Sequence, residues 1–175
     1  MKQIALLRGI NVGGKHKVPM SELKQLFEAQ GYMNVKTYIN SGNVLFSGKK
    51  ASSDQLSELI EEKFGFPVPT LVLSVPTFQK IVDAIPTEWQ NNDEYKSDVL
   101  FLWPNFDKKT VLDDTPFVEE VDEVLYIPRA LIWRVARKLQ GQSYMQRKFI
   151  GSLLYKNMTA RNANTVRALA KLLDK

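Results

Sequence analysis

Residues 6–17, LLRGINVGGKHK, are the stretch around which the fold of this chain is expected to be organised. The stretch contains three of the nine glycines, and it gathers several basic or imidazole side chains within a short segment. These side chains are Arg8, Lys15, His16 and Lys17. Glycine permits tight turns and lets other groups approach the backbone closely, so this combination predicts a flexible, electropositive loop.

The segments on either side of this loop predict a strand before it and a helix after it. Within residues 2–8, Ile4 and Leu6 alternate with Ala5 and Leu7, so apolar side chains lie on both faces, which is the pattern of a buried strand. A helix is expected to begin near Pro19 and to end at Gly31. The loop therefore carries the chain from a strand into a helix.

A hairpin and a second helix are expected next. Residues 35–39 and 44–46 are rich in strand-forming side chains and flank the turn sequence NSGN at residues 40–43. A capping-box pattern at Ser52 opens a helix, and residues 70–75 predict a fourth strand. The order strand, helix, strand, strand, helix, strand is that of a ferredoxin-like unit.

The second half of the chain repeats this order more faintly. Strands are expected at residues 98–103, 124–127 and 131–135, helices at 107–112, 144–155 and 162–173, and Thr159 in a short strand between the last two helices. We therefore predict an α+β protein of two ferredoxin-like (βαββαβ-type) units, related by duplication, with antiparallel sheets and helices packed on them. The units are expected at residues 1–86 and 95–175, joined by the polar segment 88–94.

This topology makes the glycine loop a candidate binding site. In a ferredoxin-like unit, the loop after the first strand and the turn between the second and third strands lie at the same end of the sheet. The first helix also begins there, so its unpaired N–H groups and the positive end of its dipole favour an anion such as phosphate. The candidate ligand-binding residues are Arg8, Gly9, Asn11, Gly13, Gly14, Lys15, Asn40, Ser41, Asn43 and, from the last part of the chain, Arg161.

Known nucleotide-binding motifs match this loop only in part. Gly9 and Gly14 have the spacing of a P-loop and Lys15 follows, but His16 stands where Ser or Thr would bind magnesium. Anion binding is therefore expected rather than nucleotide hydrolysis. The alternative is that the glycines serve only a tight turn and that Arg8 pairs with an acid.

Catalytic and metal-binding groups are scarce. His16 is the only histidine, and it is either an acid–base group or a solvated loop residue. The chain has no cysteine, which excludes disulfides and thiolate metal sites and suits a cytoplasmic location. No metal site is predicted, and no apolar run approaches the length of a membrane span, so no membrane partner is expected.

The formal charge of +5 is unevenly distributed. Residues 129–175 contain eleven Lys or Arg and a single acid, so the first 128 residues carry −5. Such segregation indicates a polyanionic partner, nucleic acid or nucleotide. The alternative is that the basic segment pairs with the acidic run Asp113, Asp114, Glu119, Glu120, Asp122 and Glu123.

Three motifs resemble one known family. RGINVGGKHKVPM, TYINSGNVLF and TARNANTVRAL are similar to segments of the bacterial family catalogued as domain of unknown function 1697. The resemblance spans nearly the whole chain and is most specific in the first 48 residues. It implies an α+β protein with paired ferredoxin-like units, and it brings no reaction, substrate, cofactor or catalytic residue.

Three functional hypotheses follow from these observations. The first is a protein that binds a phosphate-containing ligand, nucleic acid or nucleotide, at the glycine loop. The second is an enzyme that acts on a small phosphorylated or acidic metabolite, with His16 as acid or base. The third is a protein–protein interaction module whose acidic and basic parts recognise each other across protomers.

Overall fold

The computed structural model describes residues 1–173, which form two compact units, unit 1 (Met1–Phe78) and unit 2 (from Gln79 to the end of the described residues). The division lies inside helix α3 (Val75–Asp83), upstream of the polar segment 88–94 in which the sequence predicted the linker. Trp89 in that segment is buried, and the side chain of Arg167 donates to the carbonyl oxygens of Pro86 and Trp89 at 2.8 Å each. The segment therefore belongs to the packed part of unit 2.

Unit 1 is built on a four-stranded antiparallel sheet with the strand order β2-β3-β1-β4. The strands are β1 (Lys2–Leu7), β2 (Met33–Tyr38), β3 (Asn43–Ser47) and β4 (Thr70–Ser74). β1 is central, and side chains on both of its faces are buried, as the sequence predicts for a strand without a polar face.

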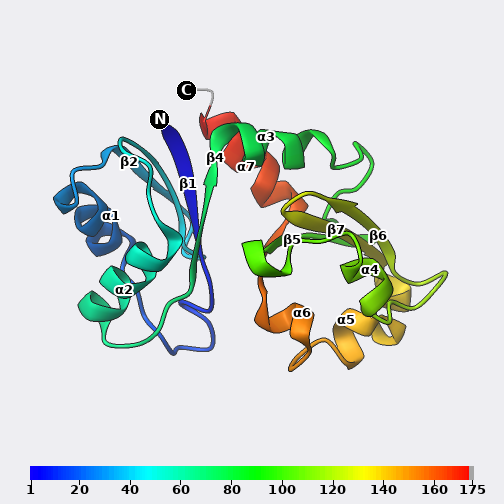
Figure 1. The fold of residues 1–175 in the computed structure, drawn as a ribbon. Coiled ribbons are helices and arrows are strands. Elements are labelled where there is room, and N and C mark those ends of the chain that lie inside the picture. The colour runs from blue at the N-terminus through cyan, green and yellow to red at the C-terminus, as the bar shows by residue number, and fades with distance from the viewer. Residues whose placement is uncertain (174–175) are drawn as a thin grey trace. The chain divides into compact units, whose positions relative to one another are not determined.

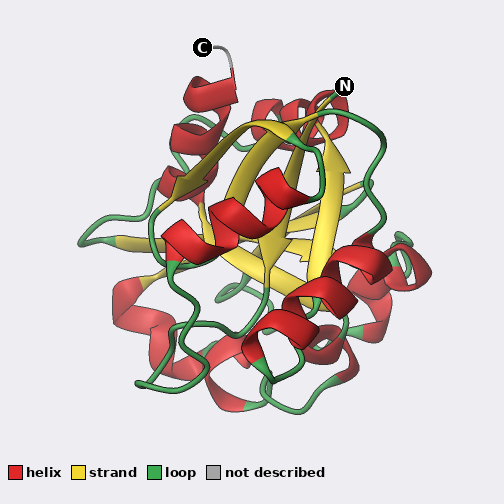
Figure 2. Cartoon of the chain, turned by 90° about the vertical axis from the view of Figure 1, so that its left-hand side faces the viewer, coloured by secondary structure: helices red, strands yellow, loops and turns green. Residues whose placement is uncertain are grey.

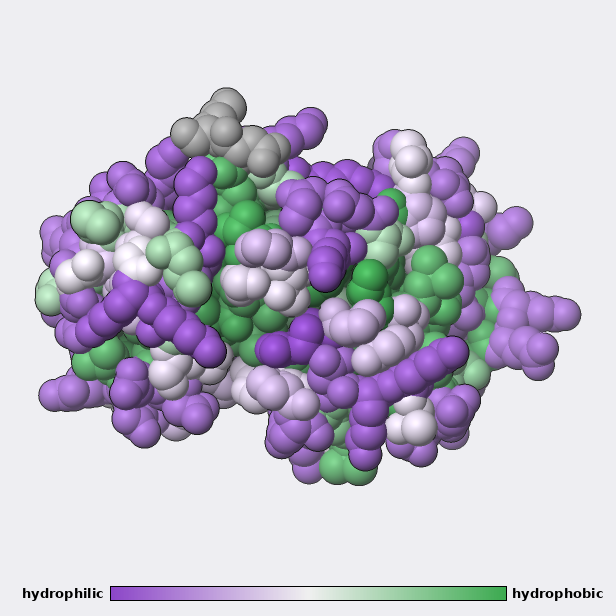
Figure 3. Space-filling view, turned by 45° about the horizontal axis from the view of Figure 1, so that its top comes forward, coloured by the Kyte–Doolittle hydropathy of each residue, from purple (hydrophilic) through white to green (hydrophobic). Residues whose placement is uncertain are grey.

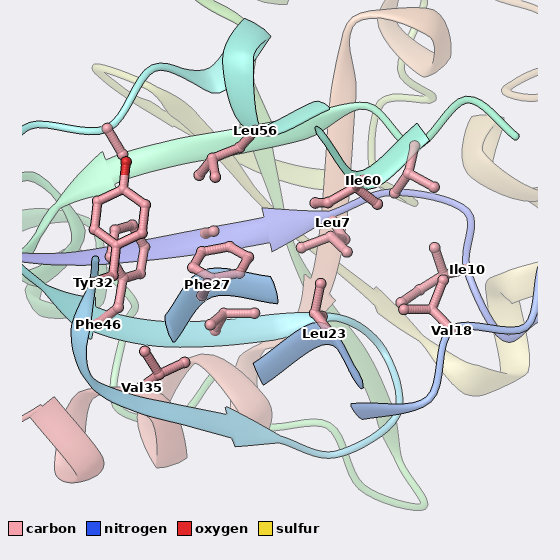
Figure 4. Close-up of a cluster of buried hydrophobic side chains, with 14 residues drawn as sticks. Leu7, Ile10, Val18, Leu23, Phe27, Tyr32, Val35, Phe46, Leu56 and Ile60 are labelled. Carbon is pink, nitrogen blue, oxygen red and sulfur yellow. The ribbon is translucent and has the colours of Figure 1, made fainter. Parts of the chain in front are cut away.

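Two helices, α1 (Met20–Ala29) and α2 (Ser53–Phe64), cover one face of this sheet (Figures 1 and 2). Leu23 and Phe27 of α1 pack with Leu56 and Ile60 of α2 in one buried cluster (Figure 4). The helix limits follow from local chemistry. The Ser52 hydroxyl accepts the Gln55 N–H at the start of α2, and residue 65, a glycine with φ 80°, ends it.

The turn between β2 and β3 packs directly on the end of β1. The Gly42 carbonyl accepts a hydrogen bond from the Leu7 N–H at 2.8 Å. Gly42 has φ 77°, and a Cβ atom there would lie 2.6 Å from Leu7 Cβ and 2.9 Å from Ile10 Cδ1. Only glycine fits both the backbone conformation and the available space.

Unit 2 has a second four-stranded antiparallel sheet, with the order β6-β7-β5-β8. Its strands are β5 (Tyr95–Leu102), β6 (Glu123–Ile127), β7 (Ala130–Ala136) and β8 (Met158–Asn162). The helices are α4 (Val111–Asp114), α5 (Tyr144–Arg147), α6 (Leu153–Lys156) and α7 (Ala163–Leu173), with 3₁₀ segments η1 (Pro104–Phe106) and η2 (Arg137–Gln142).

The packing of unit 2 places its short helices on one face of the sheet. Val111 of α4, Tyr144 of α5 and Leu154 of α6 share a buried cluster with Leu100 and Leu131 of the sheet. The predicted strand at Thr159 is confirmed as β8. The side chain of Asn162 accepts the Thr165 N–H at 2.9 Å and so caps α7, as its sequence position suggested.

Two helix predictions in unit 2 are wrong in extent. Residues 144–155 form α5 and α6 with a break between them, because Gly151 adopts φ 90° and Ser152 begins a new helix by accepting the Tyr155 N–H. The helix expected at 107–112 begins only at Val111, after the 3₁₀ segment η1.

The class of the fold agrees with the sequence analysis, since antiparallel sheets carry packed helices in both units. Within residues 1–173, no helix has both the length and the apolar character needed to cross a bilayer. Hydrophilic side chains occupy most of the face shown in Figure 3, with hydrophobic residues exposed in smaller areas.

We expect Gly42→Ala to lower the free energy of unfolding by about 2–4 kcal/mol, because it combines an unfavourable φ with overpacking against Leu7. Gly65→Ala is the matched control, since Gly65 has φ 80° but nothing within 4 Å of its would-be Cβ, and it should cost only about 1 kcal/mol. Urea unfolding monitored by circular dichroism measures both values. Equal losses in the two variants would contradict the packing constraint.

Candidate functional site

The glycine loop between β1 and α1 is anchored at both ends by buried aliphatic side chains. Ile10 and Val18 are almost fully buried, and they lie beside each other at the end of the unit 1 core close to Leu7 (Figure 4). Residues 12–17 between them are exposed. The loop is thus a short exposed segment whose two ends are fixed in the core. The spacing of Ile10 and Val18 in the sequence could have suggested this arrangement.

The exposed part of the loop is a miniature hairpin. The Lys15 N–H donates to the Val12 carbonyl at 3.1 Å, and the Asn11 N–H donates to the His16 carbonyl at 3.0 Å. Gly13 and Gly14 between them have φ 59° and 73°, and positive φ at both central positions is what a type I′ turn requires. These two glycines therefore serve a tight turn, which was the alternative interpretation of their presence.

The side chain of Asn11 closes the base of the loop. Its Oδ1 accepts the Val18 N–H at 2.9 Å, and its Nδ2 donates to the Val18 carbonyl at 3.0 Å and to the Asn40 carbonyl at 2.8 Å. Both amide hydrogens of the side chain are thereby used inside the protein. Asn11 joins the loop to the β2–β3 turn, and sequence reasoning treated it only as a ligand contact.

The β2–β3 turn meets the glycine loop, so the predicted convergence of the two segments is observed. Asn43 is fully buried, and its Nδ2 donates to the Tyr38 carbonyl and to the Ser41 hydroxyl, both at 2.9 Å. Asn40 is exposed at the rim of the turn. Of these polar residues, Asn43 shapes the turn, whereas Asn40 is accessible to solvent.

A hollow of about 380 Å³ opens where the loop, the turn and the start of α1 come together. It is lined by Asn11, Gly14, Lys17, Val18, Pro19, Met20 and Asn40. α1 has Pro19 at its N-cap position and no capping side-chain hydrogen bond, so the N–H groups of its first turn are not capped by a side chain. The hollow therefore combines an ammonium group with a helix amino terminus.

His16 has a packing partner on the loop. Its ring stacks on Phe66 with the ring centroids 4.7 Å apart and the planes inclined by 21°, and its Nδ1 lies 3.4 Å from the Gly9 carbonyl. These contacts hold the imidazole against the segment after α2. They give His16 a structural role in positioning the loop.

Two arginines of the predicted set have different surroundings. The Arg8 side chain is half-buried, and its backbone N–H donates to the Pro69 carbonyl at 2.9 Å. Arg161 lies in β8, shortly before α7, and it is 6% exposed. Its Nη1 donates to Thr159 Oγ1 at 3.0 Å and to the Ala160 carbonyl at 2.7 Å, and burial lowers the pKa of its guanidinium to about 10.

The charges of unit 1 are sorted by secondary structure. All six acidic residues of Met1–Phe78 lie on α1 or α2, whereas residues 1–21 and 29–52 together carry seven Lys or Arg and no acid. The seven are Lys2, Arg8, Lys15, Lys17, Lys36, Lys49 and Lys50. The loop segments that border the hollow thus contain Lys and Arg but no Asp or Glu. Within residues 1–173, no cluster of three or more His, Asp or Glu side chains is placed to hold a metal ion.

Comparison with known proteins agrees with this fold and adds no activity. Residues 1–133 match the family described as "Protein of unknown function (DUF1697)". The conserved bacterial protein SP0830 from Streptococcus pneumoniae has a similar solved structure, with a TM-score of 0.80, 28% sequence identity and 98% of each chain covered. No functionally curated protein matches the sequence.

We expect Asn11→Gly to loosen the glycine loop without strain, because glycine tolerates the φ of 55° found at this position but makes none of the three side-chain hydrogen bonds. Hydrogen–deuterium exchange at the Val18 amide should become faster, and the free energy of unfolding should fall by about 1–3 kcal/mol. Asn34→Gly is the control, since Asn34 has φ 54° and its exposed amide donates only to Ser47 Oγ. Unchanged amide exchange in residues 11–18 of the Asn11→Gly variant would show that the Asn11 side chain does not hold the loop in place.

Proposed function

The chain belongs to the DUF1697 family of proteins of unknown function, and within this family we propose that it binds a phosphate-containing ligand, a nucleic acid or a nucleotide, at the glycine loop of unit 1. The observation that carries the proposal is the hollow bordered by Lys17, Asn40 and the uncapped start of α1. A helix amino terminus next to an ammonium group favours an oxyanion through both the dipole and the available N–H donors.

The contacts within the site divide its residues into two groups. Asn11 and Asn43 use their amide hydrogens inside the protein, so we assign them to holding the loop and the turn in place. Lys15, Lys17 and Asn40 are exposed and are assigned to the ligand. Gly13 and Gly14 give the turn its shape and keep side-chain bulk away from the rim.

The charge distribution favours an anion with several negative groups. Loop segments that contain Lys and Arg but no Asp or Glu create a local positive potential. The acidic residues of unit 1 lie outside these segments, on α1 and α2. A nucleic acid releases condensed counterions when it binds such a surface, which makes its affinity depend steeply on salt. A nucleotide offers fewer phosphates and a weaker dependence, so salt dependence separates the two classes.

The fold itself supports a finer proposal. The sheets of unit 1 and unit 2 have the same strand order when their strands are numbered within each unit, and each unit begins with a central strand. We assign both units to the ferredoxin-like class and attribute them to duplication, with the ferredoxin-like elements lying within residues 1–86 and 95–175. Arg161 as a ligand contact and the cytoplasmic location stay predictions of the sequence.

The test is binding of fluorescently labelled single-stranded RNA and DNA oligonucleotides, and of labelled ATP, measured by fluorescence anisotropy at low and physiological salt. We expect Lys17→Glu to weaken binding by at least about tenfold, because it replaces the ammonium group of the hollow with a carboxylate. Lys50→Glu makes the same charge change next to Lys49, whose carbonyl accepts from Gln3 at the other end of β1, and should weaken binding far less.

Absence of measurable binding to all three probes at low salt would overturn the proposal. Equal losses for Lys17→Glu and Lys50→Glu would also overturn the assigned site, because they would show that only the net charge matters. Circular dichroism of both variants verifies that the fold is retained.

A further inference from the structure

Unit 2 carries two exposed segments of opposite charge that the anion site in unit 1 does not use. The acidic patch consists of Asp113, Asp114, Glu119 and Glu120, all exposed, together with Val118, which is 36% exposed. The basic patch consists of Arg147 and Lys148 with two strongly exposed aliphatic residues, Ile150 at 83% and Leu153 at 70%. Large exposed aliphatic side chains next to charges of one sign are typical of an interaction surface.

The segments that carry the two patches are joined by direct contacts within unit 2. Phe117, next to the acidic patch, packs edge-on against Tyr144 with the ring centroids 5.6 Å apart. Asp122 accepts hydrogen bonds from the Ser143 hydroxyl at 2.5 Å and from the Tyr144 N–H at 2.9 Å, which fixes the acidic segment to the start of α5. The segments on which both patches lie pack on one face of the sheet through α4, α5 and α6.

The patches do not neutralise each other within one copy. Among residues 1–173, the ion pairs of unit 2 join Lys96 to Asp98, Arg129 to Asp107, and Arg134 to Glu123, and none of them uses a charged member of either patch. Of the acidic run, Glu123 pairs with Arg134, which agrees for this residue with the alternative that the basic segment pairs with the acidic run. The remaining acids and bases are presented to solvent.

We infer that unit 2 associates with a second copy of this chain through these patches, in a two-fold arrangement that seats the acidic patch of each copy on the basic patch of the other. A two-fold interface is self-complementary, so two patches of opposite charge on one copy can form the same contact twice. Ile150 and Leu153 would leave water at the centre of each contact, between charges that steer and orient the partner.

A second copy fits these patches better than a polyanion does. An anionic surface broad enough to cover both patches would be attracted by Arg147 and Lys148 but repelled by the carboxylates of Glu119 and Glu120. A second copy that carries both patches, rotated by half a turn, meets opposite charge at each of them. The inference is independent of the anion site, because it rests on unit 2 alone.

Sedimentation velocity of the full chain over a range of concentrations tests the inference. We expect a dimer at low salt, and weaker association at high salt because the exposed charges are screened. The double variants Arg147→Glu/Lys148→Glu and Glu119→Lys/Glu120→Lys should each lose dimer, with dissociation constants raised by more than about tenfold. An equimolar mixture of the two variants should dimerise again, because both contacts in the mixed dimer then join opposite charges.

Matched charge reversals elsewhere serve as controls. Lys49→Glu/Lys50→Glu and Glu61→Lys/Glu62→Lys change exposed residues of unit 1 by the same charge and should leave the dimer intact. For the unmodified chain, amide exchange in residues 147–153 should slow as concentration rises. A monomer at every concentration, controls as damaging as the patch variants, or a mixture that stays monomeric would each overturn the inference.

Discussion

The architecture of the candidate site depends on one side-chain amide, that of Asn11, which bonds to both the main-chain N–H and the carbonyl of Val18 and to the carbonyl of Asn40. These bonds join the loop after β1 to the turn before β3, although the two segments are far apart in the sequence. Ile10 and Val18 anchor both ends of the loop in the core, so the exposed tip is held in a defined position. Asn11 and Asn40, the two residues that this junction joins, both line the hollow beside α1.

Much of the fold could be predicted because the sequence carries local signals whose physics is insensitive to context. The apolar pattern of β1, the Ser52 and Asn162 caps and the NSGN turn each select one backbone conformation through side chains close in sequence. The break between α5 and α6 was missed because an apolar, helix-compatible pattern runs through Gly151, whose left-handed conformation ends the helical stretch.

The sequence predicted that the glycine loop and the β2–β3 turn meet, but it did not predict what the individual residues do there. Convergence of the loop and the turn follows from strand order, which the sequence indicates. What Gly13, Gly14 and Asn11 do there depends on which atoms find partners after folding, and a residue name does not reveal that. A pair of glycines can cradle a phosphate or build a type I′ turn, and the φ values of this pair fit the turn. Arg161 lies close to the start of α7, as expected, and it also belongs to β8, since the residues from Met158 to Asn162 pair with β5.

The sorting of charge in unit 1 has a kinetic consequence. With its acids on two helices and an acid-free set of cations on strands and loops, the unit has a permanent electric moment in addition to its net charge. For the anionic ligand proposed above, such a moment would orient and attract the ligand before any contact is made, so productive encounters would be more frequent than random collision allows. Dissolved ions shorten the range of this attraction, so association would be faster in dilute electrolyte than in concentrated electrolyte.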